Sequence, residues 1–137
     1  MKSSMKSFMK INILVTGGLY DSQSGYSAQQ FCKAAISTGH SIEQVFFYQA
    51  AVTQGSKLSE PLADEFNDNE SWVEFSQNNN IELVVCVSAA ERRGIISEAQ
   101  HIELAKESNN LHAAFMIAGL GALHEASLNS DRTVTFK

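Results

Sequence analysis

The chain has 137 residues, 44% of them hydrophobic, which is enough to bury the core of a single domain. Its formal net charge of −5 argues against direct, sequence-independent binding of nucleic acid, because such binding requires a basic face. No apolar run approaches the roughly 18 residues that a transmembrane helix needs, so we expect no membrane partner.

Residues 1–10 carry three lysines, three serines and three methionines, and we expect them to form a disordered extension ahead of a domain over residues 11–137. The apolar stretch at 11–15 is too short and too interrupted for the hydrophobic part of a signal peptide. Two widely separated cysteines, Cys32 and Cys86, do not make a disulfide framework. We therefore expect the protein to be cytoplasmic.

Apolar runs alternate with amphipathic stretches along the first half of the chain. Gly17-Gly18 favours a tight strand-to-helix turn over a nucleotide-binding loop, because neither glycine-rich phosphate motif is present. Ser27 is expected to cap the following helix, Gly39 to stop it, and the asparagine run at 78–80 to end the next helix. In chain order, we expect a strand over residues 11–16, a loop over 20–25, a helix over 27–39, a strand over 42–48, a loop over 50–63 and a helix over 64–77.

The second half of the chain continues the alternation and places a cysteine at the end of a strand. The apolar run at 81–87 predicts a buried third strand, and a helix opens at Ser88. Ser97 and Gln100 form a candidate capping box for a further helix. In chain order, we expect that helix over residues 97–108, a short extended piece within 111–118, a helix over 120–128 and a last strand over 132–136.

This order of elements predicts an α/β fold in which helices cover both faces of a mainly parallel sheet. The crossover connections of such a sheet are expected to be right-handed. Ligands and reactive groups of these folds gather at the carboxyl ends of the strands, where the sequence places Cys86.

Cys86 is the leading candidate for chemistry. At a strand-to-helix junction, the first N–H groups of the helix lack helical carbonyl partners, and these groups with the helix dipole favour the nucleophilic thiolate. The polar turn that follows favours access to solvent. The alternative is that Cys86 merely packs in the core, as free cysteines often do, and the residues alone leave both readings open. Cys32 lies between Phe31 and Ala35 on the apolar stripe of the first helix and is expected to be a core residue.

Arg92 and Arg93 are suited to hold an anionic sulfur species or a carboxylate of a partner. The alternative is a solvated face, or pairing with Glu91 and Glu98. Cys86 and Arg92 also match the C-x5-R spacing of cysteine phosphatases, in which a loop cradles phosphate around a thiolate. The usual histidine and glycine are absent from the segment, and Glu91 would oppose the charge of the phosphate.

The four histidines do not have metal-binding spacing, and no C-x-x-C motif occurs, so we expect no metal or other cofactor. Several short motifs do occur together between residues 11 and 136. The most distinctive is Cys-Val-x-Ala-Ala-x-Arg-Arg-Gly at 86–94. The others are Val15-Thr16-Gly17 with Tyr20, Ser27-Ala28 through Phe31, Gly39-His40, Val45 to Tyr48, Gly119 to Leu123, Glu125-Ala126-Ser127 and Asp131-Arg132. With this set of motifs the chain resembles the DsrE/TusD branch of the DsrE-like sulfur-carrier proteins.

The resemblance implies a three-layer α/β/α sandwich whose persulfide-carrying cysteine is Cys86. It implies a sulfurtransferase that assembles with related B and C subunits into a heterohexamer. Such a subunit takes sulfur from a TusA-like donor and passes it to a TusE-like acceptor for 2-thiolation of the tRNA wobble uridine, without contacting nucleic acid itself. The alternatives are a DsrE subunit of a sulfur-oxidation relay and a non-catalytic structural subunit of the same complex.

We also expect roles for residues near Cys86. The Ser88 and Ala89 amides are expected to stabilise charge on sulfur, and Tyr20 with the Gly17-Gly18 loop to wall the site. Either Arg92 or Arg93 is expected to contact partner proteins electrostatically.

Overall fold

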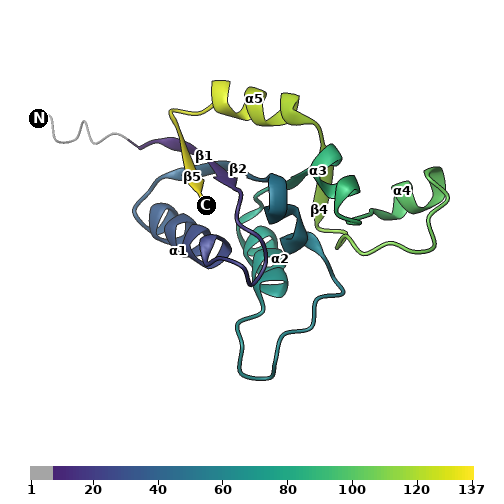
Figure 1. Cartoon of the computed structure of the whole chain (residues 1–137). Helices are drawn as coiled ribbons and strands as arrows, with labels where there is room; N and C mark the ends of the chain where they lie inside the picture. Colours follow the sequence, from purple (N-terminus) through teal and green to yellow (C-terminus); the bar gives the residue numbers. More distant parts are fainter. Residues whose placement is uncertain (1–7) are drawn as a thin grey trace, which may run out of the picture.

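The computed structural model describes residues 8–137 and folds them around a five-stranded sheet (Figure 1). Every pair of neighbouring strands is parallel, and the strand order is β4-β3-β2-β1-β5. The expected α/β fold is confirmed, and the parallel pairing extends to all five strands. The strands are β1 (Lys10–Val15), β2 (Ser41–Phe47), β3 (Leu83–Cys86), β4 (Phe115–Ala118) and β5 (Arg132–Phe136).

Helices lie on both faces of the sheet. Helices α1 (Ser24–Ser37) and α2 (Asp68–Asn79) cover one face, and α5 (Leu120–Leu128) crosses the other (Figure 1). The chain steps outward from β1 to β4 and then returns to β5 beyond β1, and a right-handed return places α5 on the opposite face. The shorter elements are the 3-10 helix η2 (Gln49–Gly55), α3 (Val87–Arg92) and α4 (Glu98–Glu103), and α4 lies in a segment that projects from the body.

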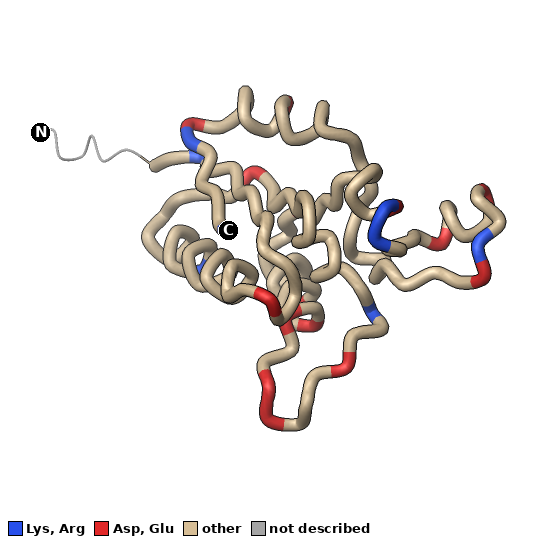
Figure 2. Tube along the Cα trace, in the orientation of Figure 1, with Lys and Arg blue, Asp and Glu red and all other residues tan. Residues whose placement is uncertain are grey.

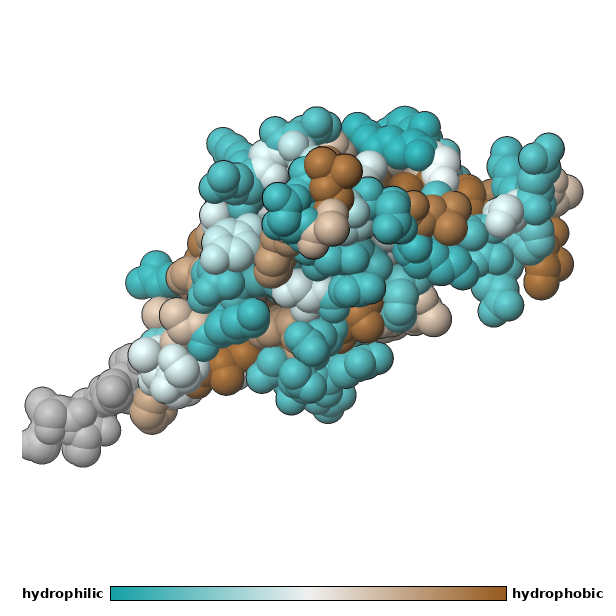
Figure 3. Space-filling view, turned by 90° about the horizontal axis from the view of Figure 1, so that it is seen from below, coloured by the Kyte–Doolittle hydropathy of each residue, from teal (hydrophilic) through white to brown (hydrophobic). Residues whose placement is uncertain are grey.

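The core lies between the central strands and the helices α1 and α2. The rings of Phe47 and Trp72 meet edge to face with centroids 5.1 Å apart, and Phe115 packs against Phe47 at 5.4 Å. All four residues of β3 are buried, as expected for a strand covered on both faces. Figure 3, seen from below, shows a mainly hydrophilic surface with separate hydrophobic patches. Each large buried side chain contributes about 1.5–3 kcal/mol to folding.

Helix α1 begins at Ser24, ahead of the predicted cap Ser27, and that prediction is wrong. The Oγ atom of Ser22 accepts a hydrogen bond from the Ser24 N–H at 3.0 Å, so the chain turns into the helix earlier. The connection predicted at Gly17-Gly18 runs from Val15 to Ser24 and is longer than a tight turn, but a Cβ atom at Gly17 would lie 2.0 Å from the Ser22 Oγ atom, so the chain has room only for glycine there. Gly39, with φ of +101°, follows the end of α1 as predicted.

Helix α2 and the segment before it also differ from the sequence-based expectation. The helix begins at Asp68, later than predicted, because Asn67 caps it by accepting a hydrogen bond from the Glu70 N–H at 3.1 Å. Asn80 ends it in the left-handed conformation, with φ of 55°, as the asparagine run predicted. Part of the loop expected over 50–63 is the helix η2, whose residues Ala51 and Val52 are fully buried.

The second half follows the predicted order of elements. Strand β3 ends before Val87, which is the first residue of α3. The capping box of Ser97 and Gln100 is confirmed. Helix α4 ends at Glu103, earlier than predicted, and Ala105 has a left-handed φ of 54°. The extended piece within 111–118 is β4, and α5 and β5 have the predicted bounds.

The first strand, β1, begins within the expected extension. Lys10 is the first residue of β1, and the Met9 N–H donates to the Nδ1 atom of His40 at 2.9 Å. The ring of Phe8 lies edge-on to the ring of His40. Residues 1–7 of that extension lie outside the described residues. Over residues 8–137, no helix combines the length and apolar character required to cross a bilayer.

Candidate functional site

Cys86 lies where β3 gives way to α3. It is the last residue of the strand and the N-cap of the helix, with an extended backbone at φ −69° and ψ 126°. Strand β3 lies between β2 and β4, so Cys86 is at the carboxyl end of an interior strand of the sheet. Ser88 and Ala89 fall in the first turn of α3, where N–H groups have no helical carbonyl partners. The junction predicted from the sequence is confirmed.

The thiol of Cys86 is almost completely enclosed. The residue is 1% exposed, whereas the sequence favoured access to solvent. Its Sγ atom lies 3.6 Å from the Oγ atom of Ser88, and Ser88 is exposed. Helix η2 packs against both β3 and α3, and it presents the buried residues Ala51 and Val52. In this conformation the Cys86 thiol therefore has almost no contact with solvent.

Cys32 occupies the core position that its sequence pattern predicts. It is fully buried within α1. Because burial strips water from the thiol, desolvation raises the pKa of Cys32 to about 12. At neutral pH this thiol is protonated and packs as a small hydrophobic group.

The two arginines after Cys86 are exposed. The Arg93 Nη1 group donates to the carbonyl oxygen of Ala89 at 3.2 Å. Glu91 accepts a hydrogen bond from Gln100 at 2.9 Å instead of pairing with a guanidinium. Among residues 8–137 the only ion pair within 4 Å joins Lys10 to Glu43, so the alternative that the arginines pair with Glu91 and Glu98 is wrong. Their charges are available to solvent or to a partner.

The phosphatase spacing does not correspond to a phosphate loop. Residues 87–92 form the helix α3, so their amides follow the helix axis and do not encircle the sulfur. With a rise of about 1.5 Å per residue, Arg92 lies about 9 Å along the axis from Cys86. This geometry does not cradle a phosphate around the thiol.

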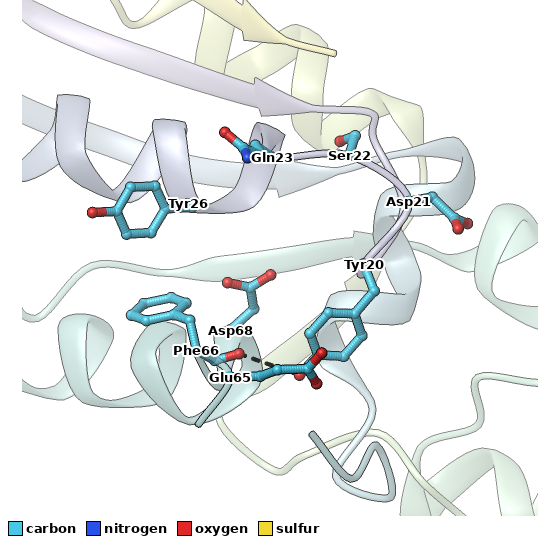
Figure 4. Close-up of a pocket in the computed structure, with 8 residues that line it drawn as sticks. All are labelled: Tyr20, Asp21, Ser22, Gln23, Tyr26, Glu65, Phe66 and Asp68. Atoms are coloured by element: carbon cyan, nitrogen blue, oxygen red, sulfur yellow. Dashed lines mark hydrogen bonds between the residues drawn. The ribbon is translucent and has the colours of Figure 1, made fainter. Parts of the chain in front are cut away.

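Tyr20 lines a cavity of about 460 Å³ between the β1–α1 loop and the start of α2 (Figure 4). Cys86 is not among the residues that line this cavity. Tyr20 adopts a left-handed φ of 66°, and its hydroxyl donates to the carbonyl oxygen of Phe66 at 3.3 Å. The structure thus brings Ser88 and Ala89 to Cys86 and places Tyr20 in a separate pocket.

Sequence reasoning missed Gln54, which joins three elements near these sites. Its side chain donates to the carbonyl oxygen of Gly17 at 3.0 Å and accepts from the Trp72 indole N–H at 2.7 Å. Its own carbonyl oxygen accepts from the side chain of Asn69 at 2.8 Å. These hydrogen bonds of Gln54 hold η2 against the loop that follows β1 and against α2. Gln54 is a polar residue in a segment that we expected to be a loop, so the sequence did not indicate that it would be buried.

The DsrE/DsrF-like family matches residues 9–136, almost the whole described chain. The protein belongs to the DsrE/DsrF-like family. It is 46% identical over 124 residues to the sulfurtransferase TusD homolog of Vibrio parahaemolyticus, a match that covers 90% of this chain and 95% of that protein. It is 41% identical over 130 residues to the sulfurtransferase TusD homologs of two strains of Vibrio vulnificus, with 95% of this chain and 99% of those proteins covered.

A solved structure supports the fold of this DsrE-like chain. The crystal structure of the ychN protein from E. coli matches with a TM-score of 0.74 at 21% identity, covering 94% of this chain and 100% of that one. At this level of identity the likeness concerns the fold alone. The resemblance to the DsrE/TusD branch that the sequence motifs carried is confirmed by the family match and the relatives together.

Proposed function

We propose that this DsrE-like protein is a sulfurtransferase that carries a persulfide on Cys86 and relays sulfur between carrier proteins. The observation that carries the proposal is the position of Cys86 at the junction of β3 and α3. The sulfurtransferase names of relatives that are 41–46% identical over most of the chain support it. From the resemblance of the sequence motifs to the DsrE/TusD branch, we assign the relay to 2-thiolation of the tRNA wobble uridine.

The chemistry consists of two exchanges at sulfur. The Cys86 thiolate attacks the terminal sulfur of a donor persulfide, a new S–S bond forms, and the donor cysteine leaves as a thiolate. An acceptor thiolate then attacks the terminal sulfur on Cys86, and Cys86 leaves as a thiolate. Each step breaks one S–S bond and forms another, so no external oxidant or reductant is consumed. The rates depend on the thiolate fraction, on the leaving group and on access to the sulfur.

Neighbouring groups of Cys86 fit this chemistry. The first-turn amides at Ser88 and Ala89 and the Ser88 hydroxyl, 3.6 Å from the Sγ atom, supply dipoles that favour an anionic sulfur. A larger persulfide needs more room than the closed thiol has. We therefore infer that docking of a partner displaces η2 or α3 before transfer.

We assign the partners from the same resemblance to the DsrE/TusD branch. Related B and C subunits complete a cytoplasmic heterohexamer, a TusA-like protein delivers sulfur, and a TusE-like protein receives it. The protein itself does not contact nucleic acid, in line with its net charge of −5. Because donor and acceptor both need the Cys86 sulfur, their surfaces overlap and the two proteins compete for binding.

Mass spectrometry of the intact protein tests the proposal. After exposure to a persulfidated carrier protein, the wild type is expected to gain the mass of one sulfur atom. Cys86→Ser is expected to gain none, and the matched variant Cys32→Ser is expected to load like the wild type. Loading of Cys86→Ser to the wild-type level would overturn the assignment.

The enclosure of Cys86 at 1% exposure favours one competing function, that of a structural subunit whose thiol is unused. A relay assay with the assembled complex separates the two. If the complex with Cys86→Ser still passes sulfur to the acceptor at the wild-type rate, the protein is a scaffold. If transfer stops, Cys86 carries the sulfur.

A further inference from the structure

The cavity of about 460 Å³ beside the β1–α1 loop has a lining of aromatic rings and carboxylates (Figure 4). Its volume is in the range of small-molecule sites. Tyr26 and Phe66 face each other edge to face, with ring centroids 5.1 Å apart. No lysine or arginine is among the lining residues. The rings belong to Tyr20, Tyr26 and Phe66, and the carboxylates to Asp21, Glu65 and Asp68.

Asp68 is the least solvated of these acids. The residue is 8% exposed, and its carboxylate points into the cavity (Figure 4). No residue of the described part of the chain donates a hydrogen bond to this carboxylate or forms an ion pair with it within 4 Å. Desolvation raises the pKa of Asp68 from its ordinary value. The Asp68 carboxylate lies in the first turn of α2 and faces the cavity without a side-chain partner among residues 8–137, so a cation that entered the cavity would form an ion pair with it.

The aromatic walls suit the same kind of ligand. The face of an aromatic ring attracts a cation, and a ring that is held in place loses little entropy on binding. The hydroxyl of Tyr20 is bonded to the Phe66 carbonyl oxygen, which links two of the walls. Figure 2 shows that acidic residues also gather along the loop that leads to α2. Anions are therefore disfavoured throughout this region.

We propose that this cavity binds a cationic group on an alkyl stem, a guanidinium or an ammonium. Asp68 forms the ion pair, and the rings of Tyr20, Tyr26 and Phe66 enclose the stem and the charged head. The site is distinct from Cys86, and its occupation does not depend on persulfide transfer.

A titration followed by amide NMR shifts tests the site, with n-butylguanidinium and n-butylammonium as probes and 1-butanol as the neutral control. At low salt, both cations are expected to cause saturable shifts at the amides of residues 20–26 and 66–68, and the alcohol is expected to cause none. Asp68→Asn is expected to weaken binding by about tenfold or more, because a charged hydrogen-bond partner is lost. Glu70→Gln alters an exposed acid in the same helical turn that does not line the cavity, so it should bind like the wild type.

The absence of saturable shifts, equal shifts with the alcohol, or unchanged affinity in Asp68→Asn would overturn the proposal. Tyr26→Leu provides a second variant should Asp68→Asn fold poorly, since Tyr26 is 45% exposed. Its affinity for the cations is expected to fall several-fold, and an unchanged affinity would equally overturn the site. The tripeptide acetyl-Gly-Arg-Gly-amide identifies the source of the cation. If the peptide binds as tightly as butylguanidinium, the ligand is a side chain of a protein, and if only the small cation binds, it is a free molecule.

Discussion

Cys32 and Cys86 are almost equally buried, at 0% and 1% exposure, but their surroundings differ. Cys32 lies within α1, where the backbone amides are used by the helix itself and desolvation alone sets the pKa at about 12. Cys86 is the N-cap residue of α3 with the Ser88 hydroxyl 3.6 Å away, and the short helix η2 packs against both β3 and α3. Under the proposed function, in which Cys86 reacts and Cys32 does not, burial by itself does not separate the two thiols. The polar groups at the sulfur and the segment that covers it make the difference.

The largest expected contrast is the rate of alkylation of the two thiols in the native protein. At pH 8 a thiol with a pKa of about 12 is thiolate in only about one molecule in 10⁴. We also expect Cys32 to become accessible only through global unfolding and Cys86 through local opening. We expect iodoacetamide to modify Cys86 about 10³-fold faster than Cys32, as measured by peptide mass spectrometry. Equal rates, or faster modification of Cys32, would remove the distinction.

The second contrast is the pH dependence of stability. The folded pKa of Cys32 is raised from 9.0 to about 12, so its stabilising contribution is complete below pH 9 and declines as pH rises from 9 toward 12. Between pH 7 and pH 10 the free energy of unfolding of the wild type should fall by about 1.4 kcal/mol more than that of Cys32→Ala. Urea unfolding at the two pH values measures this difference. A parallel decline in the two proteins would contradict the assigned pKa.

The third contrast concerns η2, the helix that we infer to cover Cys86. Gln54→Ala removes the side-chain hydrogen bonds that hold η2 to Gly17 and Trp72. We expect alkylation of Cys86 to accelerate about tenfold, because loss of a buried hydrogen bond costs about 1–3 kcal/mol, and we expect no effect on Cys32.

Gln44→Ala is the matched control. Gln44 is also buried, and it donates to the Ala122 carbonyl oxygen at 3.2 Å on the α5 face of the sheet. If both glutamine variants accelerated the modification of Cys86 equally, general destabilisation would explain the effect. The assignment of η2 as the cover would then fail.

The smallest expected effect is electrostatic. Replacing Arg92 and Arg93 together with alanine should weaken binding of the sulfur-carrying protein about threefold at low salt, and the difference should vanish at high salt. Lys33→Ala removes an exposed positive charge next to Cys32 and should leave this binding unchanged. Surface plasmon resonance at two ionic strengths measures the affinities. An equal loss for the Lys33 variant would indicate that only net charge matters.

Local chemistry made much of the fold predictable. The bounds of α5 and β5, the capping box of Ser97 and Gln100, and the left-handed end of α2 at Asn80 depend on neighbouring residues, and all agree with the sequence-based expectation. The predicted start of α1 was wrong, because the helix begins at Ser24 after the N-cap residue Gln23, and Ser22 accepts a hydrogen bond from the Ser24 N–H ahead of Ser27.

Long-range packing could not be predicted in the same way. Cys86 lies between β3 and α3, both of which contact η2, and the buried Gln54 of η2 forms hydrogen bonds with distant elements. The position of Cys86 itself was predictable, since a strand and a helix meet there in sequence. The cavity is lined by Tyr20 in the β1–α1 loop and by Asp68 at the start of α2. These segments are far apart in the sequence, so no local pattern predicts that they lie close together.

The pairing of β5 with β1 has a consequence for biosynthesis. The Lys10 N–H donates to Asp131 and the Asn12 side chain to Thr133, in each case across 121 positions of the chain. On the ribosome, β1 emerges early and must wait with one edge unpaired until Phe136 has left the exit tunnel. A nascent chain stalled before that point would expose a strand edge prone to mispairing. Translation speed over the final segment and the supply of chaperones should therefore govern the soluble yield of this protein.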